Sequence, residues 1–281
     1  FDESVENLKK ARAHHVKLDS WLTTGMLKGF MDGSLGSSTA ALLAPYADDH
    51  GNSGLPRYSQ EQLNKMVAER VAADFQIGFH AIGDRGAEMA LDAFAYGAKQ
   101  ANKDAKALRM RIEHDQVIAP SQFTRYRDLG VIASVQPSHL LTDMNWAEAR
   151  IGKERARTSY PWAQFLQDNV RIAFGTDYPV EPITPFRGLY AAVTRKNETG
   201  NKTYYPEQAL NIDQAIAAYT RGAAYAEFAE TNKGTIAKGM LADFVVLDRD
   251  ITNVRPEDIL LTRVLRTVVG GKTVYEAGPR E

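Results

Sequence analysis

The feature that most constrains the fold is a repeated unit, in which a short apolar run ends in a polar residue and a helical pattern follows. Five such runs occur, at residues 25–33, 75–80, 108–114, 131–139 and 170–177. Between them apolar residues recur at helical spacing, as in Ala87, Ala90 and Phe94. Strands that alternate with helices predict parallel βα units and an α/β fold. In such units the chemistry collects at the carboxyl ends of the strands.

Local start and stop signals support this alternation. Ser59 followed by Gln62 predicts a capping box, and Gly130 predicts the end of a helix that opens near Pro120. Pro161 suits a first helical turn, and Asn211 suits an N-cap. The helices are therefore expected to lie between the apolar runs, as the repeat requires.

The pattern changes after about residue 230. Glycines there separate short β-rich runs at 242–247, 264–269 and 273–275, and no helical pattern of comparable length follows each run. The sequence therefore predicts two domains, a βα domain over residues 1–230 and a small β flank over residues 231–281.

Composition excludes several classes of function. The chain has 281 residues, 34 basic and 35 acidic, so it has no overall field for nucleic acid or acidic lipid. Its apolar runs are too short to span a membrane. The absence of Cys excludes disulfides, thiolate zinc sites and a Cys nucleophile. The chain opens with Phe1, so we expect that it begins inside a longer protein or follows a removed signal peptide. The compartment stays open between cytoplasm and periplasm.

Five strand ends present residues that carry chemistry: Lys28, His80, His114, His139 and Asp177. Imidazole nitrogen and carboxylate oxygen both bind divalent metals. An ammonium cannot bind a cation, so Lys28 would serve only as a carbamate formed with carbon dioxide. Two His and an Asp at the ends of successive strands favour a metal site.

Plainer interpretations stand beside each of these. A single His at a strand end is more often a hydrogen-bonded structural residue, and Lys28 alone would be a surface lysine. Asp32 and Asp84 each adjoin a Gly and fit turns. Glu113 either orients a ligand or pairs with Arg111.

Several segments resemble the amidohydrolase superfamily, in the branch that includes YtcJ-like proteins and N-substituted formamide deformylases. The segments are Lys28-Gly-Phe-Met-Asp-Gly-Ser-Leu-Gly-Ser, His80-Ala-Ile-Gly-Asp-Arg, Arg111-Ile-Glu-His, Gln136-Pro-Ser-His, Phe174-Gly-Thr-Asp-Tyr-Pro-Val and the closing stretch that begins at Lys233. They occur in the family's order and extend over nearly the whole chain.

The resemblance implies a distorted TIM-type (β/α) barrel, a flanking β-sandwich and a centre of one or two metal ions. It implies that Lys28, carboxylated, together with His80, His114 and Asp177 binds metal. Asp177 would also be the catalytic residue that handles the proton of the attacking water. His139 would contact the substrate. The donor set suits zinc first, with iron, manganese or nickel as alternatives.

One departure concerns the family's first strand, which ends in a His-x-His pair that this chain lacks. By the family count the chain holds about strands 4 to 8, so we expect an incomplete barrel with open edges. We expect either a missing amino-terminal segment as partner or self-association. The isolated chain is expected to be inactive.

Two functional hypotheses follow. In the first, the chain is the carboxyl-terminal part of a metal-dependent hydrolase that cleaves C–N, amide-type bonds of a small-molecule substrate. In the second, it is a catalytically silent regulatory or interaction domain. A third hypothesis, a metal-free lyase or aldolase that uses Lys28 as a Schiff base, leaves His80, His114 and Asp177 unexplained.

Overall fold

The computed structural model describes residues 1–15 and 25–278 of the chain. By contact density the chain divides into two compact units, 1–134 with 146–171, and 135–145 with 172–281. This division follows compactness alone, so the boundary predicted at residue 231 stays a prediction. Within the described ranges, no helix has both the length and the apolar character that crossing a membrane requires.

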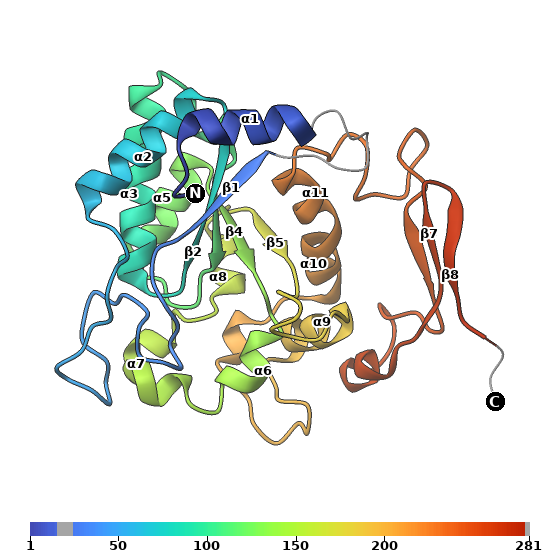
Figure 1. The fold of residues 1–281 in the computed structure, drawn as a ribbon. Helices are drawn as coiled ribbons and strands as arrows, with labels where there is room; N and C mark the ends of the chain where they lie inside the picture. Colours follow the sequence, from blue (N-terminus) through green and yellow to red (C-terminus); the bar gives the residue numbers. More distant parts are fainter. Residues whose placement is uncertain (16–24, 279–281) are drawn as a thin grey trace. The chain divides into compact units, whose positions relative to one another are not determined.

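The predicted α/β class is confirmed by a parallel sheet with the strand order β1-β2-β3-β4-β5 (Figure 1). The strands are β1 (Met26–Phe30), β2 (Gln76–Ala81), β3 (Arg111–His114), β4 (Ile132–Val135) and β5 (Ile172–Phe174). The register pairs Phe30 with His80 and His80 with Glu113. Because paired residues in a parallel sheet share a face, these three side chains start from the same side.

Along the chain, four of the described helices of the first unit lie between its strands, as the repeat predicts. These are α2 (Gln60–Ala72), α3 (Asp84–Gln100), α4 (Ala105–Leu108) and α5 (Gln122–Leu129), while α1 (Val5–His15) precedes β1 and α7 (Ala147–Ala156) and α8 (Trp162–Gln167) follow β4. Ser59 caps α2 by accepting from the Gln62 N–H, and Gly130 ends α5 with φ of 68°. Helices α2 and α3 approach closely at Gly97, where an added Cβ would lie 2.7 Å from Val67.

The second unit holds β5 and a further set of helices. They are α6 (His139–Asp143), α9 (Pro185–Thr194), η1 (Pro206–Gln208), α10 (Ile212–Ala217), η2 (Ala218–Gly222), α11 (Ala223–Ala226) and η3 (Pro256–Leu261). The predicted cap at Asn211 is confirmed, because it forms a capping box with Gln214. Gly222 allows η2 to approach β5, since a Cβ there would lie 2.3 Å from the Ile172 carbonyl oxygen.

The predicted β flank is an antiparallel sheet with the order β6-β7-β8. Its strands are β6 (Phe244–Leu247), β7 (Val264–Val269) and β8 (Lys272–Glu276). Figure 1 shows β7 and β8 side by side at the end of the chain. The described residues form one sheet here, so the second layer of a sandwich stays a prediction.

Three predicted strands end earlier than the runs at 25–33, 131–139 and 170–177 suggest, and the placement of three site residues is corrected. β4 ends at Val135, because Pro137 lacks an N–H for the sheet, and His139 is instead the first residue of α6. β5 ends at Phe174, and Asp177 lies in the following loop with φ of 58°. Lys28 lies in the middle of β1 rather than at its end.

Candidate active site

Two imidazoles meet at the carboxyl ends of the neighbouring strands β2 and β3. The ring centroids of His80 and His114 lie 4.5 Å apart in an edge-to-face arrangement. The register pairs His114 with Ala81, so a regular strand would point His114 to the face opposite His80. The φ angle of His114 is 82°, which interrupts the alternation where β3 ends. Non-glycine residues keep such angles only where the surroundings enforce them, and they concentrate at functional sites.

Asp115 helps to hold the backbone at the end of β3, where His114 lies. It has φ of 49° and donates its backbone N–H to the Ala81 carbonyl oxygen at 3.2 Å. Its Oδ1 accepts a short hydrogen bond from the Tyr126 hydroxyl, while Oδ2 has no hydrogen-bond partner among the described residues. Burial raises the pKa of the Asp115 carboxyl and of the Tyr126 phenol well above their ordinary values. The strained His114 corner therefore rests on a fully buried acid–phenol pair.

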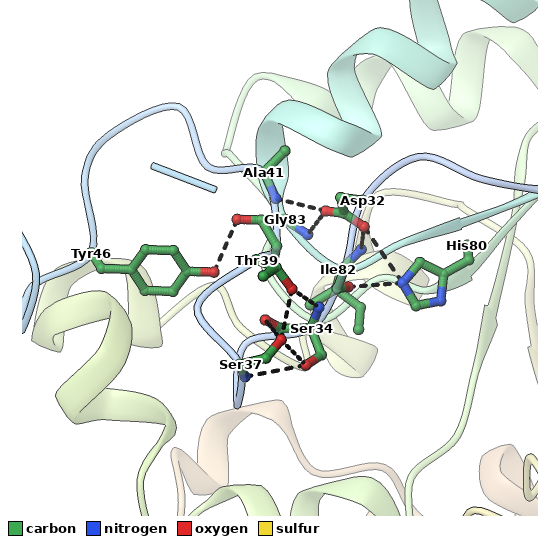
Figure 2. A network of polar contacts seen from close by, with 11 residues as sticks. Asp32, Ser34, Ser37, Thr39, Ala41, Tyr46, His80, Ile82 and Gly83 are labelled. Carbon is green, nitrogen blue, oxygen red and sulfur yellow. Dashed lines mark hydrogen bonds and ion pairs between the residues drawn. The ribbon is translucent and has the colours of Figure 1, made fainter. Parts of the chain in front are cut away.

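The His80 ring also contacts the loop that follows β1 (Figure 2). Its Nε2 lies 2.8 Å from the Gly33 carbonyl oxygen and 3.5 Å from Oδ1 of Asp32. A carbonyl oxygen only accepts, so Nε2 carries the proton and the lone pair of a neutral ring is on Nδ1. Burial raises the pKa of the Asp32 carboxyl to about 6, against the opposing effect of backbone donors from Gly83, Ile82 and Ala41.

Lys28 and Glu113 start from the same face of the sheet as His80. Lys28 is exposed, and its Nζ lies 5.3 Å from the centroid of the Phe30 ring. Glu113 is buried and accepts two hydrogen bonds from the Arg111 guanidinium on one oxygen, at 2.8 and 2.7 Å. Of the two interpretations of Glu113, the structure therefore contains the pair with Arg111.

The remaining two candidates, His139 and Asp177, lie together in the second unit. Nε2 of His139 is 3.8 Å from Oδ2 of Asp177, and the Asp177 side chain is 35% exposed. The Asp177 carbonyl oxygen accepts the Val180 N–H at 2.8 Å, which turns the loop immediately after it. The acid is thus beside an imidazole and partly open to solvent.

By chemical type, the imidazoles of His80 and His114 are donors that a divalent cation accepts. His80 and His114 are adjacent, and His80 donates its Nε2–H to a backbone carbonyl, the pattern that orients metal-binding histidines. No group of three or more His, Asp or Glu side chains in residues 1–15 and 25–278 is arranged to hold a metal. Lys28 would be the further ligand in the family's arrangement, and only as a carbamate.

Sequence patterns did not identify Asp32, Asp115 and Tyr126 as parts of the site. Asp32 adjoins Gly33 and fits a turn, although its side chain is fully buried. The available signal is its position two residues after β1, the strand that carries Lys28. Asp115 follows His114 and gave a similar signal, whereas Tyr126 lies on α5 and gave none. The residues that hold the imidazoles therefore emerge only from the fold.

A parallel sheet of βα units with paired imidazoles at neighbouring strand ends is the arrangement that the sequence resemblance implies for the amidohydrolase class of proteins. The chain belongs to the amidohydrolase family, since the model of that family matches residues 2–275. This confirms the resemblance found in the sequence motifs.

The relatives agree with this assignment. The chain is 36% identical to Protein LONG AFTER FAR-RED 3 of Arabidopsis thaliana, over 92% of this chain and 44% of that protein. It is 31% identical to the putative amidohydrolase YtcJ of Bacillus subtilis, over 94% of this chain and 51% of that protein. The chain spans about half the length of these curated relatives.

Solved structures point the same way. An uncharacterized metal-dependent hydrolase from Pyrococcus horikoshii superposes with a TM-score of 0.78 at 32% identity, over 89% of this chain and 50% of that one. A Xaa-Pro dipeptidase superposes with a TM-score of 0.61 at 18% identity, and shows the shared fold alone.

Proposed function

We propose that the protein containing this chain is a metal-dependent hydrolase of C–N, amide-type bonds in small molecules. The observation that carries the proposal is the pair of imidazoles of His80 and His114, in which His80 donates Nε2–H to the Gly33 carbonyl. Family membership supports hydrolysis of C–N bonds in general. A further relative, 25% identical over 91% of this chain, is the N-substituted formamide deformylase of Arthrobacter pascens.

Each residue has a defined part in this proposal. His80 and His114 would hold a divalent cation, zinc first, with Lys28 as a third ligand once carboxylated. When bound, such a cation supplies Lewis-acid chemistry, since it lowers the pKa of water from about 15.7 towards about 7 and polarises a carbonyl. The Glu113–Arg111 pair neutralises buried charge on the same face of the sheet.

Asp177 and His139 would move the proton. Asp177 accepts the proton of the attacking water and returns it to the leaving nitrogen, whose amine is otherwise a poor leaving group. His139, 3.8 Å from the Asp177 carboxylate, contacts the substrate and fixes the orientation of the acid. Asp177 as a metal ligand belongs to the same proposal.

Alanine substitution in the full-length protein tests the function. We expect His80→Ala and Asp177→Ala each to remove hydrolysis of a panel of amides and N-substituted formamides. His50→Ala is the matched control, because His50 is exposed and lies in a polar loop. Hydrolysis that persists unchanged in His80→Ala and Asp177→Ala would overturn the proposed mechanism.

We propose that the isolated chain binds metal more weakly and is less active than an intact enzyme. It lacks the His-x-His pair of the family, so it would bind at most one ion per site, weakly, and show little activity. Metal analysis of the chain should find no more than one equivalent after dialysis. Two tightly held ions would contradict this.

A silent regulatory or interaction domain is the second candidate. A relative supports it by name, the Exoenzymes regulatory protein AepA of Pectobacterium carotovorum, 29% identical over 61% of this chain. The strained corner at His114 favours the hydrolase instead, because a silent domain has no need to maintain it. The alanine variants above separate the two candidates.

The partner of the chain is also a proposal. Strands at the ends of a sheet leave N–H and C=O groups unpaired, and these pair readily with another chain. We propose that the chain self-associates or binds an amino-terminal segment, as an incomplete barrel would. Light scattering of the purified chain should report a mass above that of one copy, and a monodisperse monomer would contradict self-association.

A further inference from the structure

The Asp32 carboxylate is the most heavily bonded acid beside the candidate site (Figure 2). Its Oδ2 accepts the N–H groups of Ala41 at 2.9 Å and Gly83 at 2.8 Å, and its Oδ1 accepts that of Ile82 at 3.0 Å. All three lengths are those of good hydrogen bonds. A single buried side chain thus joins the loop after β1 to the turn after β2.

This junction lies against the backbone of His80. Ile82 and Gly83 follow His80 by two and three residues, so their bonds to Asp32 fix the chain where β2 ends. The Ala41 carbonyl oxygen accepts the N–H groups of Arg85 and Gly86, which fixes the first turn of α3 to the same loop. The position of the His80 main chain is therefore set by Asp32 and its neighbours.

The same junction holds the His80 ring. Gly33 directly follows Asp32 and supplies the carbonyl that accepts from Nε2 at 2.8 Å, while Oδ1 of Asp32 lies 3.5 Å from that nitrogen. Both are acceptors, so together they favour the ring orientation that directs Nε2–H towards the loop. Nδ1, on the far side of the ring, then carries the lone pair.

We propose that Asp32 is a positioning residue, which holds His80 in the tautomer and orientation needed to bind a metal through Nδ1. Only the metal-binding part of this inference rests on the proposed function. The orientation and tautomer of the His80 ring can be tested in the chain without metal. Removal of such an orienting partner lowers metal affinity by about ten- to a hundredfold.

Asp32→Asn tests the proposal directly. The amide must turn its NH2 group towards Ile82 and His80, or towards Ala41 and Gly83, and in either orientation a donor then faces a donor. The Ile82 side has one backbone donor rather than two, so we expect the NH2 group there, where it opposes the His80 Nε2–H.

The first measurement is the rate at which the ring N–H of His80 exchanges with water. It is monitored by proton–nitrogen NMR of the histidine-labelled chain, without metal, at pH 8.5. The signal is assigned by its loss in His80→Gln. In the wild type we expect a visible Nε2–H that exchanges slowly with water. In Asp32→Asn we expect exchange at least about tenfold faster or loss of the signal, because the acceptors no longer hold the proton.

The second measurement is the affinity of the same chain for Zn²⁺, determined by titration. We expect Asp32→Asn to weaken it by about ten- to a hundredfold. Tyr46→Phe is the matched control, because it removes a bond from the same loop, the Tyr46 hydroxyl to the Ala40 carbonyl at 2.9 Å, without touching His80. It should leave both the ring signal and the zinc affinity unchanged.

Gly86→Ala replaces Asp32→Asn if that variant does not fold. A Cβ at Gly86 would lie 2.8 Å from Oδ2 of Asp32, so the carboxylate must shift although its charge remains. Faster ring exchange in either variant supports the proposal, and unchanged exchange in a folded variant overturns it. A wild type with the slow ring signal but no zinc binding would overturn the metal function and leave the positioning role supported.

Discussion

The two imidazole–carboxylate pairs of the chain differ in how firmly each is held. Asp32 beside His80 is buried and accepts three backbone N–H groups. Asp177 beside His139 is 35% exposed and 3.8 Å from the ring. A group that orients a ligand must not move, whereas a group that exchanges protons with water and substrate must be accessible. The difference agrees with our proposal, in which the first pair orients a ligand and the second transfers a proton.

The largest expected effect is a loss of activity when the exposed pair, Asp177 and His139, is altered in the full-length protein. Asp177→Asn preserves the shape of the side chain but removes its capacity to accept a proton, so kcat should fall by about a hundredfold to ten-thousandfold. His139→Asn should raise KM more than it lowers kcat, because His139 is proposed to contact the substrate. Steady-state kinetics with one amide substrate measures both. Equal, small effects on kcat would remove the distinction between the two pairs.

Zinc affinity tests the residues around the buried pair, beginning with His114, the neighbour of His80. His114→Ala should weaken zinc binding by the chain at least about tenfold, because an imidazole ligand is lost. His50→Ala should not change it, since His50 is exposed in a loop. Titration with Zn²⁺ alone gives both affinities. If both variants bind zinc as the wild type does, His114 is not a ligand.

A third effect concerns the support of His114. Tyr126→Phe leaves the buried Asp115 carboxyl without its hydroxyl donor and should lower the free energy of unfolding by about 1–3 kcal/mol. Tyr46→Phe breaks a bond to a neutral carbonyl and should cost about 0.5–1.5 kcal/mol. Urea unfolding of the two variants compares them. A larger loss for Tyr46→Phe would show that the Asp115–Tyr126 pair is not the stronger support.

The smallest effect lies in the β flank, in Asp248. Hydrogen bonds from the Arg249 guanidinium and the Arg263 backbone hold the pKa of the Asp248 carboxyl well below its ordinary value. A carboxyl whose pKa is lower in the folded state stabilises the fold at pH values above its unfolded pKa of about 3.9. This stabilisation is lost as the pH falls through the pKa of the folded state. Asp248→Asn should therefore lower the Tm slightly at pH 7, and the difference should shrink below pH 4. A difference that grows in acid would contradict this sign.

The sequence predicted the alternation of strands and helices, whereas the residues that hold the candidate site residues in place could not be predicted from it. Periodicity and caps placed α3, α5 and α10, because those signals are local. The ends of β4 and β5 differ from the prediction, because the chain leaves the sheet at Val135 and at Phe174, before the polar residues His139 and Asp177 that the repeat places at strand ends. Asp32 fits a turn in the sequence, and the burial of Asp32 and Asp115 depends on contacts with other segments, such as those with Ala41 and Tyr126.

The orientation of His114 was unpredictable for a related reason. Strand alternation places its side chain opposite that of His80, and only the positive φ brings the rings together. Such an angle in a non-glycine residue depends on the surrounding contacts rather than on its own preference. The motif identified His114, and the fold explains how it reaches its neighbour.

The central claim, metal-dependent hydrolysis of C–N bonds, is tested most directly by chelation of the full-length protein. Hydrolysis of an amide substrate is measured before dialysis against a chelator, after it, and after zinc is returned. The account predicts that activity is lost with the metal and restored with zinc in the wild type, and is not restored in His80→Ala. Hydrolysis that continues at the same rate in the metal-free protein would contradict it.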